Sequence, residues 1–280
     1  MKIKAFAKLN LGLKITGAKG AYHTLDMLCA SVNLCDEVEI IPRPPFSLEV
    51  ESNVADFNKE RFKSYLTEKI NKYALFGSLL NSKIYIKKNI PSGAGLGGGT
   101  AVLSAFAFYA MNSGETASNE ELSKISSDLP YMLKGGFKRV KGTGDIIESA
   151  GIDKELSFLV VKPLGGVDSG AAFLLYDEMV KEGRAKSENK IEDIIRAINA
   201  GGEIPFFNDL EPAAARLNKG ISPLKDSLEK AFERKAFMTG SGSALALLTS
   251  GDEDTDEILK SVEGYAFAAK VKTENLGVIF

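Results

Sequence analysis

The stretch that most constrains the fold is residues 91–100, which read Pro-Ser-Gly-Ala-Gly-Leu-Gly-Gly-Gly-Thr. Five of the seven residues from Gly93 to Gly99 are glycines, which add no side chain to a core and lose much backbone entropy on folding. Residues 82–90 alternate apolar and polar side chains, which predicts a half-buried strand, and the apolar residues 101–111 predict a buried helix. A glycine loop between a strand and a helix start directs backbone N–H groups and the helix dipole at an anion. We therefore predict a phosphate-binding loop rather than a flexible surface turn.

Two common phosphate-binding patterns fit this loop poorly. A Walker A loop is excluded, because no Gly-Lys-Ser/Thr follows the glycines. Gly93, Gly95 and Gly98 do match the G-x-G-x-x-G pattern of dinucleotide-binding proteins. That motif usually opens its domain, however, whereas about ninety residues precede it here. A dinucleotide-dependent oxidoreductase is therefore the least favoured alternative.

The composition indicates a soluble globular protein of one large domain or two ordinary ones. The chain has 280 residues, 44% of them hydrophobic and 26% charged, and a net charge of −2. This balance predicts neither nucleic-acid nor membrane binding, and no apolar stretch approaches the 18 residues of a membrane span. Cys29 and Cys35 match neither a metal motif nor a disulfide framework, which favours free thiols in the cytoplasm. His23 is the only histidine, so a metal site built on imidazoles is excluded.

The order of predicted elements indicates an α+β protein in two lobes, residues 1–150 and 151–280. We expect a strand over 3–15 broken at Gly12, a loop over 17–22, and further strands over 25–34, 38–40 and 48–50. An amphipathic helix is expected within 56–76, and a capping box at Ser118 opens a short helix. A hairpin is expected over 137–147. Further strands are predicted over 157–161, 244–249 and 265–272, and helices over 169–182, 188–200 and from Ser222 as N-cap.

Three further stretches carry candidate site residues. Lys8 and Asn10 project from one face of an alternating strand, which on its own is also typical of a solvent-exposed face. Asp128 precedes a proline by two positions, a spacing typical of a turn or helix end. Residues 238–243, Met-Thr-Gly-Ser-Gly-Ser, form a second glycine loop that is otherwise an ordinary tight turn.

Taken together, these motifs resemble those of the GHMP small-molecule kinases. The resemblance rests on Ala-Lys-Leu-Asn-Leu at 7–11, the loop at 91–100, Asp-Leu-Pro at 128–130 and Gly-Ser-Gly at 240–242, in that order. It implies a ribosomal-protein-S5-like N-terminal lobe and a ferredoxin-like C-terminal lobe, with the active site between them. It further implies that Lys8 and Asp128 are catalytic in phosphoryl transfer. It implies ATP and Mg²⁺ as cofactors. The ATP phosphates would be held by Pro91, Gly93, Gly95, Leu96, Gly97, Gly98, Gly99 and Thr100.

Within that family, the triple glycine is most similar to the members that phosphorylate the 2-hydroxyl of 4-diphosphocytidyl-2-C-methyl-D-erythritol, in isoprenoid precursor synthesis. Tyr22 and His23 match the pair that recognises cytosine there, and Phe173 falls in the stretch that covers the other face of the base. Asn10, Gly240, Ser241 and Gly242 would complete the substrate site. Asn-Asp-Leu-Glu-Pro at 208–212 also matches these members, and a structural role is expected for it.

The chain departs from the family pattern where Ala101 and Val102 replace the usual Ser and Asp or Asn. Three interpretations therefore stay open: a kinase of this cytidylyl substrate, a kinase of another alcohol such as homoserine or a mevalonate derivative, and a catalytically silent nucleotide-binding relative. The sequence assigns no metal ligands, adenine contacts or oligomeric state.

Overall fold

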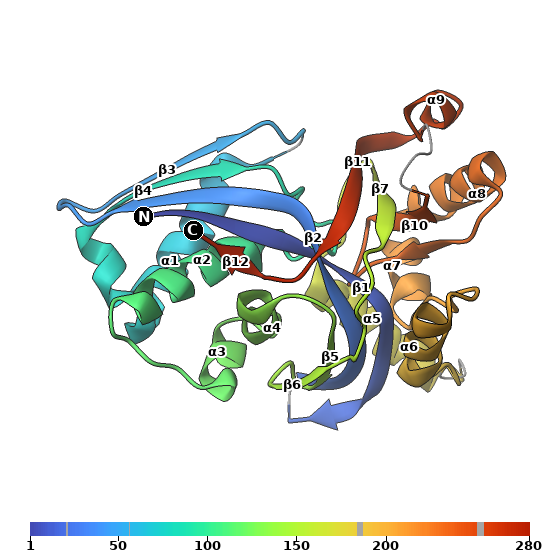
Figure 1. Cartoon of the computed structure of the whole chain (residues 1–280), viewed down its shortest axis with the longest axis horizontal. Coiled ribbons are helices and arrows are strands. Elements are labelled where there is room, and N and C mark those ends of the chain that lie inside the picture. Colours follow the sequence, from blue (N-terminus) through green and yellow to red (C-terminus); the bar gives the residue numbers. More distant parts are fainter. Residues whose placement is uncertain (21, 56, 184–186, 251–254) are drawn as a thin grey trace.

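The computed structural model describes residues 1–20, 22–55, 57–183, 187–250 and 255–280. Its framework is a long antiparallel hairpin of β1 (Lys2–Lys19) and β2 (Tyr22–Ile41). The parallel pair β3 (Ser47–Ser52) and β4 (Lys83–Lys88) joins β2 through β4. Figure 1 shows the hairpin running from this sheet into the middle of the molecule, where the two halves of the chain meet.

The predicted break at Gly12 is wrong, because β1 continues through it to Lys19. The predicted loop over 17–22 is wrong at residues 17–19, which belong to β1, and at Tyr22, which begins β2; residue 21 lies outside the described residues. Gly12 instead marks a shift of register between β1 and β2. A Cβ atom at Gly12 would lie 2.5 Å from Ile194 Cδ1, so the glycine lets α6 (Ile191–Ala200) approach the strand closely.

Helices pack along one side of the first sheet (Figure 1). α1 (Lys59–Lys72) and the 3₁₀ segment Ala74–Asn81 form the predicted amphipathic helix region, and α2 (Gly98–Asn112) is the buried helix that follows the glycine loop. α3 (Asn119–Ile125) begins with the predicted capping box between Ser118 and Glu121. α4 (Leu129–Lys134) then begins directly after Asp128. The predicted hairpin is confirmed as β5 (Lys138–Gly142) and β6 (Ile146–Ser149).

The second half of the chain builds the sheet β11-β7-β10-β9 from β11 (Tyr265–Glu274), β7 (Ser157–Pro163), β10 (Leu245–Thr249) and β9 (Ala236–Met238). Its helices are α5 (Ser169–Lys181), α6, α7 (Glu211–Leu217), α8 (Ile221–Phe232) and α9 (Thr255–Leu259). The prediction that Ser222 caps a helix is wrong. α8 already begins at Ile221 after Gly220, so Ser222 lies inside its first turn.

The last strands return to the first hairpin. β11 pairs with both β7 and β2, β12 (Val278–Ile279) pairs with β1, and β8 (Phe207–Asn208) runs parallel to β1. The predicted α+β architecture is confirmed, and the division near residue 150 stays a prediction. In the part of the chain that the structure describes, no helix combines the length and apolar character needed to span a bilayer.

Candidate active site

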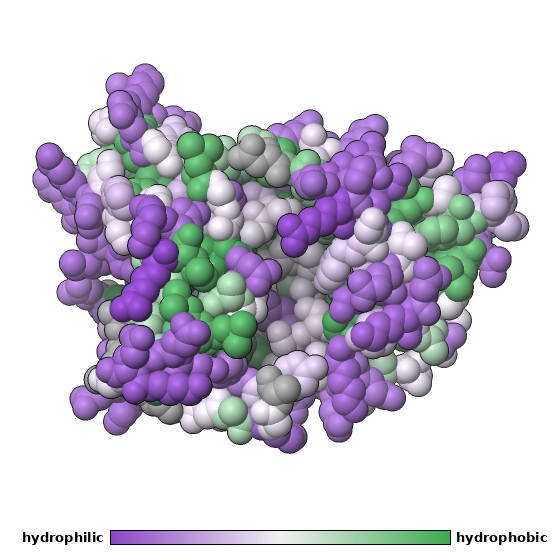
Figure 2. Space-filling view, turned by 180° about the vertical axis from the view of Figure 1, so that it is seen from behind, coloured by the Kyte–Doolittle hydropathy of each residue, from purple (hydrophilic) through white to green (hydrophobic). Residues whose placement is uncertain are grey.

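A cavity of about 730 Å³ collects the predicted site residues from both halves of the chain. A hollow opens near the middle of the face seen in Figure 2. Every candidate named from the sequence lines this cavity: Lys8, Asn10, Tyr22, His23, Pro91, Gly93, Gly95, Leu96, Gly97, Gly98, Gly99, Thr100, Asp128, Phe173, Gly240, Ser241 and Gly242. Residues separated by more than two hundred positions therefore share one space.

Several carbonyl groups of the glycine loop accept hydrogen bonds from backbone N–H groups of other segments. Gly93 O accepts hydrogen bonds from Val167 N at 3.2 Å and Ser243 N at 2.9 Å, and Leu96 O accepts from Lys8 N at 3.1 Å. Among the described residues, none of the N–H groups from Gly93 to Gly97 has a protein acceptor. Donors that line a cavity without acceptors are what an anion such as phosphate needs.

The two glycine loops pack against each other so closely that side chains are excluded. A Cβ atom on Gly95 would lie 2.0 Å from Thr239 O, and one on Gly240 would lie 2.5 Å from Gly95 O. Gly95 also has φ of +73° and Gly240 has φ of +58°, which glycine adopts at little cost. The second glycine loop is therefore a structural support of the first.

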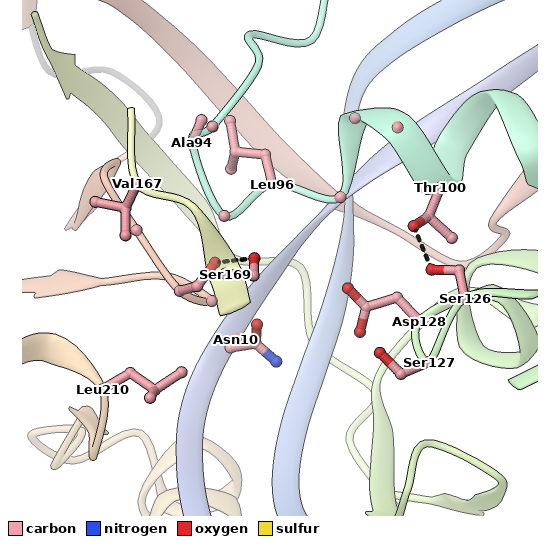
Figure 3. A pocket seen from close by; sticks show the side chains of 18 of the residues that line it. Asn10, Ala94, Leu96, Thr100, Ser126, Ser127, Asp128, Val167, Ser169 and Leu210 are labelled. Atoms are coloured by element: carbon pink, nitrogen blue, oxygen red, sulfur yellow. Dashed lines mark hydrogen bonds between the residues drawn. The ribbon is translucent and has the colours of Figure 1, made fainter. Parts of the chain in front are cut away.

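Lys8 and Asp128 meet at the floor of the cavity. Lys8 Nζ lies 3.8 Å from Asp128 Oδ2, with the lysine side chain 5% exposed and the aspartate side chain 29% exposed. Lys8 also donates a hydrogen bond to the amide oxygen of Asn10, and both residues are buried, so this face of β1 is not a solvated surface. Figure 3 shows the Asp128 carboxylate below the Thr100 and Ser126 hydroxyls. A carboxylate held beside a buried ammonium is suited to accept a proton from an alcohol.

Two sulfur atoms lie beneath Asn10. Its Nδ2 atom lies 3.2 Å from Cys29 Sγ and 3.3 Å from Met27 Sδ, contacts that leave its oxygen facing Lys8. Burial raises the pKa of the Cys29 thiol to about 12, against a smaller opposing effect of the Lys8 ammonium. The thiol is therefore neutral at physiological pH and acts as a packing group.

A buried ion pair supports the start of the loop from behind. Lys88 and Asp36 have side chains that are 0% exposed and joined by a hydrogen bond. Asp36 Oδ1 accepts from the backbone N–H groups of Asn89 at 2.8 Å and Ile90 at 2.9 Å, and Lys88 Nζ donates to Ile90 O at 2.7 Å. Burial raises the pKa of Asp36 and lowers the pKa of Lys88, each against the attraction of its partner. The pair fixes the three residues that lead into Pro91.

The groups near the phosphate end suit a metal ion that arrives with a nucleotide. Thr100 Oγ1 and Ser126 Oγ lie 2.8 Å apart, and Asp128 supplies the nearby carboxylate (Figure 3). Mg²⁺ is commonly held by one or two carboxylates, phosphates and waters, so this set fits it. No cluster of three His, Cys, Asp or Glu side chains able to hold a metal occurs within the described ranges.

Ala101 and Val102, the two residues that depart from the family pattern, are both 0% exposed and do not line the cavity. They therefore belong to the core against which α2 packs.

The cavity is also lined by aromatic and hydroxyl groups from β2, α5 and the second glycine loop. The His23 ring stacks on Phe173 with centroids 4.7 Å apart and an interplanar angle of 21°. Its Nε2 atom lies 2.9 Å from Asp177 Oδ1, while the neighbouring Tyr22 is 70% exposed. Ser169 Oγ and Ser241 Oγ lie 2.6 Å apart and join α5 to the second glycine loop, as the dashed line in Figure 3 shows.

Sequence reasoning missed the aromatic wall beside the glycine loop. Phe62 and Tyr65 project from α1 into the cavity, and their ring centroids lie 6.3 Å apart. A Cβ atom on Gly99 would lie 3.6 Å from the Tyr65 ring, so the wall borders the start of α2. Burial raises the pKa of Tyr65 to about 12, which keeps the phenol neutral. The spacing of two aromatics at i and i+3 on an amphipathic helix was the available signal.

Comparison with known proteins establishes the family. Residues 61–145 match the pattern described as "GHMP kinases N terminal domain", and residues 179–267 match "GHMP kinases C terminal". A relative from Hydrogenobaculum sp. is 31% identical over 283 residues, covering 96% of this chain and 94% of the relative. The chain therefore belongs to the GHMP kinases, which makes it a small-molecule kinase that uses ATP.

The relatives carry a more specific name. The Hydrogenobaculum protein is called 4-diphosphocytidyl-2-C-methyl-D-erythritol kinase. So is a protein from Carboxydothermus hydrogenoformans that is 31% identical over 269 residues, with 92% of this chain and 91% of the relative covered. The crystal structure of a 4-(cytidine 5'-diphospho)-2C-methyl-D-erythritol kinase superimposes with a TM-score of 0.75 at 22% identity, over 98% of this chain and 99% of that one. The predicted two-lobed GHMP kinase fold is thus confirmed, and the oxidoreductase alternative is set aside.

Proposed function

We propose that this protein transfers the terminal phosphoryl group of ATP to the 2-hydroxyl of 4-diphosphocytidyl-2-C-methyl-D-erythritol, with Mg²⁺. The observation that carries the proposal is the 3.8 Å approach of Lys8 Nζ to Asp128 Oδ2 in a cavity that has a phosphate-type glycine loop along one wall. The names of the relatives from Hydrogenobaculum and Carboxydothermus support the choice of substrate.

In this proposal Asp128 orients the substrate hydroxyl and accepts its proton as the oxygen attacks the terminal phosphorus. The Lys8 ammonium stabilises the negative charge on the carboxylate and on the attacking oxygen, and Asn10 holds Lys8 through its amide oxygen. The free N–H groups of the loop hold the nucleotide phosphates, so the protein contributes chiefly positioning and charge stabilisation. Mg²⁺ would be held by Asp128 and the hydroxyls of Thr100 and Ser126 with the phosphates, and would neutralise phosphate charge.

The cytidylyl end of the substrate belongs, in this proposal, at the aromatic end of the cavity. Tyr22 and Phe173 would stack on the two faces of the cytosine, and His23 would hydrogen-bond its edge. Gly240, Ser241 and Gly242 would lie against the sugar alcohol and its phosphates. The wall of Phe62 and Tyr65 would then receive the adenine of ATP, because it borders the opposite end of the glycine loop.

A coupled assay of ADP release tests the proposal across the cytidylyl substrate, homoserine and mevalonate. We expect activity with the first alone, and loss of at least about a thousandfold in kcat for Lys8→Met and Asp128→Asn. Lys4→Met on the exposed face of the same strand is the matched control and should retain wild-type activity. Unchanged turnover in either site variant, or wild-type activity on homoserine or mevalonate instead, would contradict the assignment. Binding of ATP without turnover of any of the three alcohols would favour a silent relative.

We further propose a division into two domains near residue 150. We also propose a cytoplasmic location, which the free thiols of Cys29 and Cys35 support.

A further inference from the structure

Asp177, which belongs to none of the predicted motifs, contacts the histidine of the cavity, His23. Asp177 and Phe173 lie four residues apart on α5 and therefore share one face of the helix. Phe173 stacks on the His23 ring and fixes its plane, while Asp177 Oδ1 lies 2.9 Å from Nε2 and fixes its rotation. Two side chains of one helix thus define the orientation of the imidazole.

The contact also determines which nitrogen of a neutral imidazole carries the proton. An ionised carboxylate only accepts hydrogen bonds, so Nε2 must be the protonated nitrogen and Nδ1 keeps a lone pair. Within the described part of the chain, Nδ1 has no hydrogen-bond partner. His23 therefore offers an acceptor to a ligand in the cavity that it lines.

We infer that Asp177 is a positioning residue that determines base specificity, because it holds His23 in the tautomer whose Nδ1 accepts from the exocyclic amino group of a cytosine. Uracil carries a carbonyl oxygen at that position, and two facing lone pairs repel. The inference rests on the proposed function for its cytidylyl substrate, and adds a residue that acts through His23 without touching the reacting atoms.

The substitution Asp177→Asn tests the role of Asp177, because the introduced amide can reverse the direction of its hydrogen bond with His23. The introduced amide has the same size as the carboxylate. Its nitrogen donates to an unprotonated Nε2 of His23, which moves the ring proton to Nδ1, whereas its oxygen would keep the original tautomer by accepting from Nε2–H. With the proton on Nδ1, that nitrogen would be a donor, which opposes the cytosine amino group and suits the uracil carbonyl. Asp177→Leu, which neither donates nor accepts, removes the restraint on the tautomer in either case. A structural role alone does not predict a change in base preference.

The experiment measures binding of CDP and UDP by calorimetry at pH 8. ADP release is measured in parallel with the cytidylyl substrate. For the wild-type protein we expect a preference for CDP, and for Asp177→Asn a fall of about tenfold or more in the CDP-to-UDP affinity ratio. The KM for the cytidylyl substrate should rise in that variant while kcat stays within about twofold. Asp177→Glu keeps a carboxylate that only accepts, and should retain part of the preference for CDP over UDP. Glu178→Gln, a neighbour on the same helix, is the control.

The outcomes separate the two proposals. If the wild-type protein binds CDP and UDP equally and does not phosphorylate the cytidylyl substrate, the proposed function fails. If the wild-type protein prefers CDP and turns the substrate over, but neither Asp177→Asn nor Asp177→Leu lowers the affinity ratio, the role of Asp177 is overturned and the proposed function stands.

Discussion

The buried pair of Asp36 and Lys88 should be one of the most sensitive points of this fold. Replacing Lys88 by methionine keeps the volume of the side chain but leaves the Asp36 carboxylate buried without its counter-ion. Because both side chains are 0% exposed, solvent cannot compensate. Breaking such a pair from one side costs about 3–5 kcal/mol. For a chain of this size 1 kcal/mol corresponds to a shift of about 2 °C, so we expect the melting temperature to fall by about 6–10 °C.

The double variant Asp36→Asn/Lys88→Met separates loss of the charge pair from loss of packing. The amide introduced by Asp36→Asn would keep an oxygen to accept from Asn89 N and Ile90 N, and no charge would remain buried. The double variant should therefore recover more than half of the stability lost in Lys88→Met, which gives a coupling free energy of about 2 kcal/mol or more. Thermal unfolding followed by circular dichroism measures all four proteins of the cycle. Additive losses, or a shift below about 2 °C for Lys88→Met, would refute the reasoning.

Three further outcomes follow from the structure. Gly95→Ala should raise the KM for ATP and lower the melting temperature, because its Cβ would lie 2.0 Å from Thr239 O. Gly77→Ala, whose Cβ meets nothing within 4 Å and which does not line the cavity, should behave like the wild type in both measurements. In the native protein at pH 8, a small thiol reagent should not modify Cys29, because a thiol with a pKa of about 12 is ionised to only about one part in ten thousand at that pH. In the unfolded protein the reagent should modify both cysteines. Rapid modification of Cys29 in the native protein, located by mass spectrometry, would contradict its burial. The pKa of the same thiol is near 9 in the unfolded chain, so the unfolded state loses this proton at a lower pH than the native state does. The free energy of unfolding should therefore fall as the pH rises from about 9 towards 12. The substitution Cys29→Ala should weaken that pH dependence.

The sequence predicted the site best where a motif depends on backbone geometry. The run of glycines between a strand and an apolar helix predicted the loop that precedes α2, and the capping box at Ser118 predicted α3, because each depends on residues within one short stretch. Phosphate binding by that loop stays a prediction. Element boundaries were less predictable. β1 runs through Gly12 because α6 covers that glycine, and α6 lies about 180 residues further along the chain.

Contacts between distant stretches account for what sequence reasoning could not supply. Nothing near Asp36 indicates that its partner is Lys88, and nothing near Asp177 indicates that it faces His23. Each pair joins elements whose packing is set by the whole sheet. The alternating pattern around Lys8 and Asn10 was ambiguous for the same reason. Both glycine loops and α4 pack against this part of β1, and their packing turns an ordinary strand face into a buried one.

The orientation of the glycine loop follows from the bonds that its carbonyls make. In a trans peptide the C=O and the following N–H point in opposite directions. Gly93 O, Ala94 O and Leu96 O are bound by Val167 and Ser243, by Ala244 and by Lys8 respectively. The N–H groups of Ala94, Gly95 and Gly97 must therefore point away from those partners, and all three residues line the cavity. The donors are thus aimed before any nucleotide arrives, and Lys8 takes part twice: its backbone orients the loop, and its side chain holds charge beside Asp128. This double use of one residue is the structural reason why the strand that carries Lys8 and the loop that would hold the phosphates keep a fixed distance.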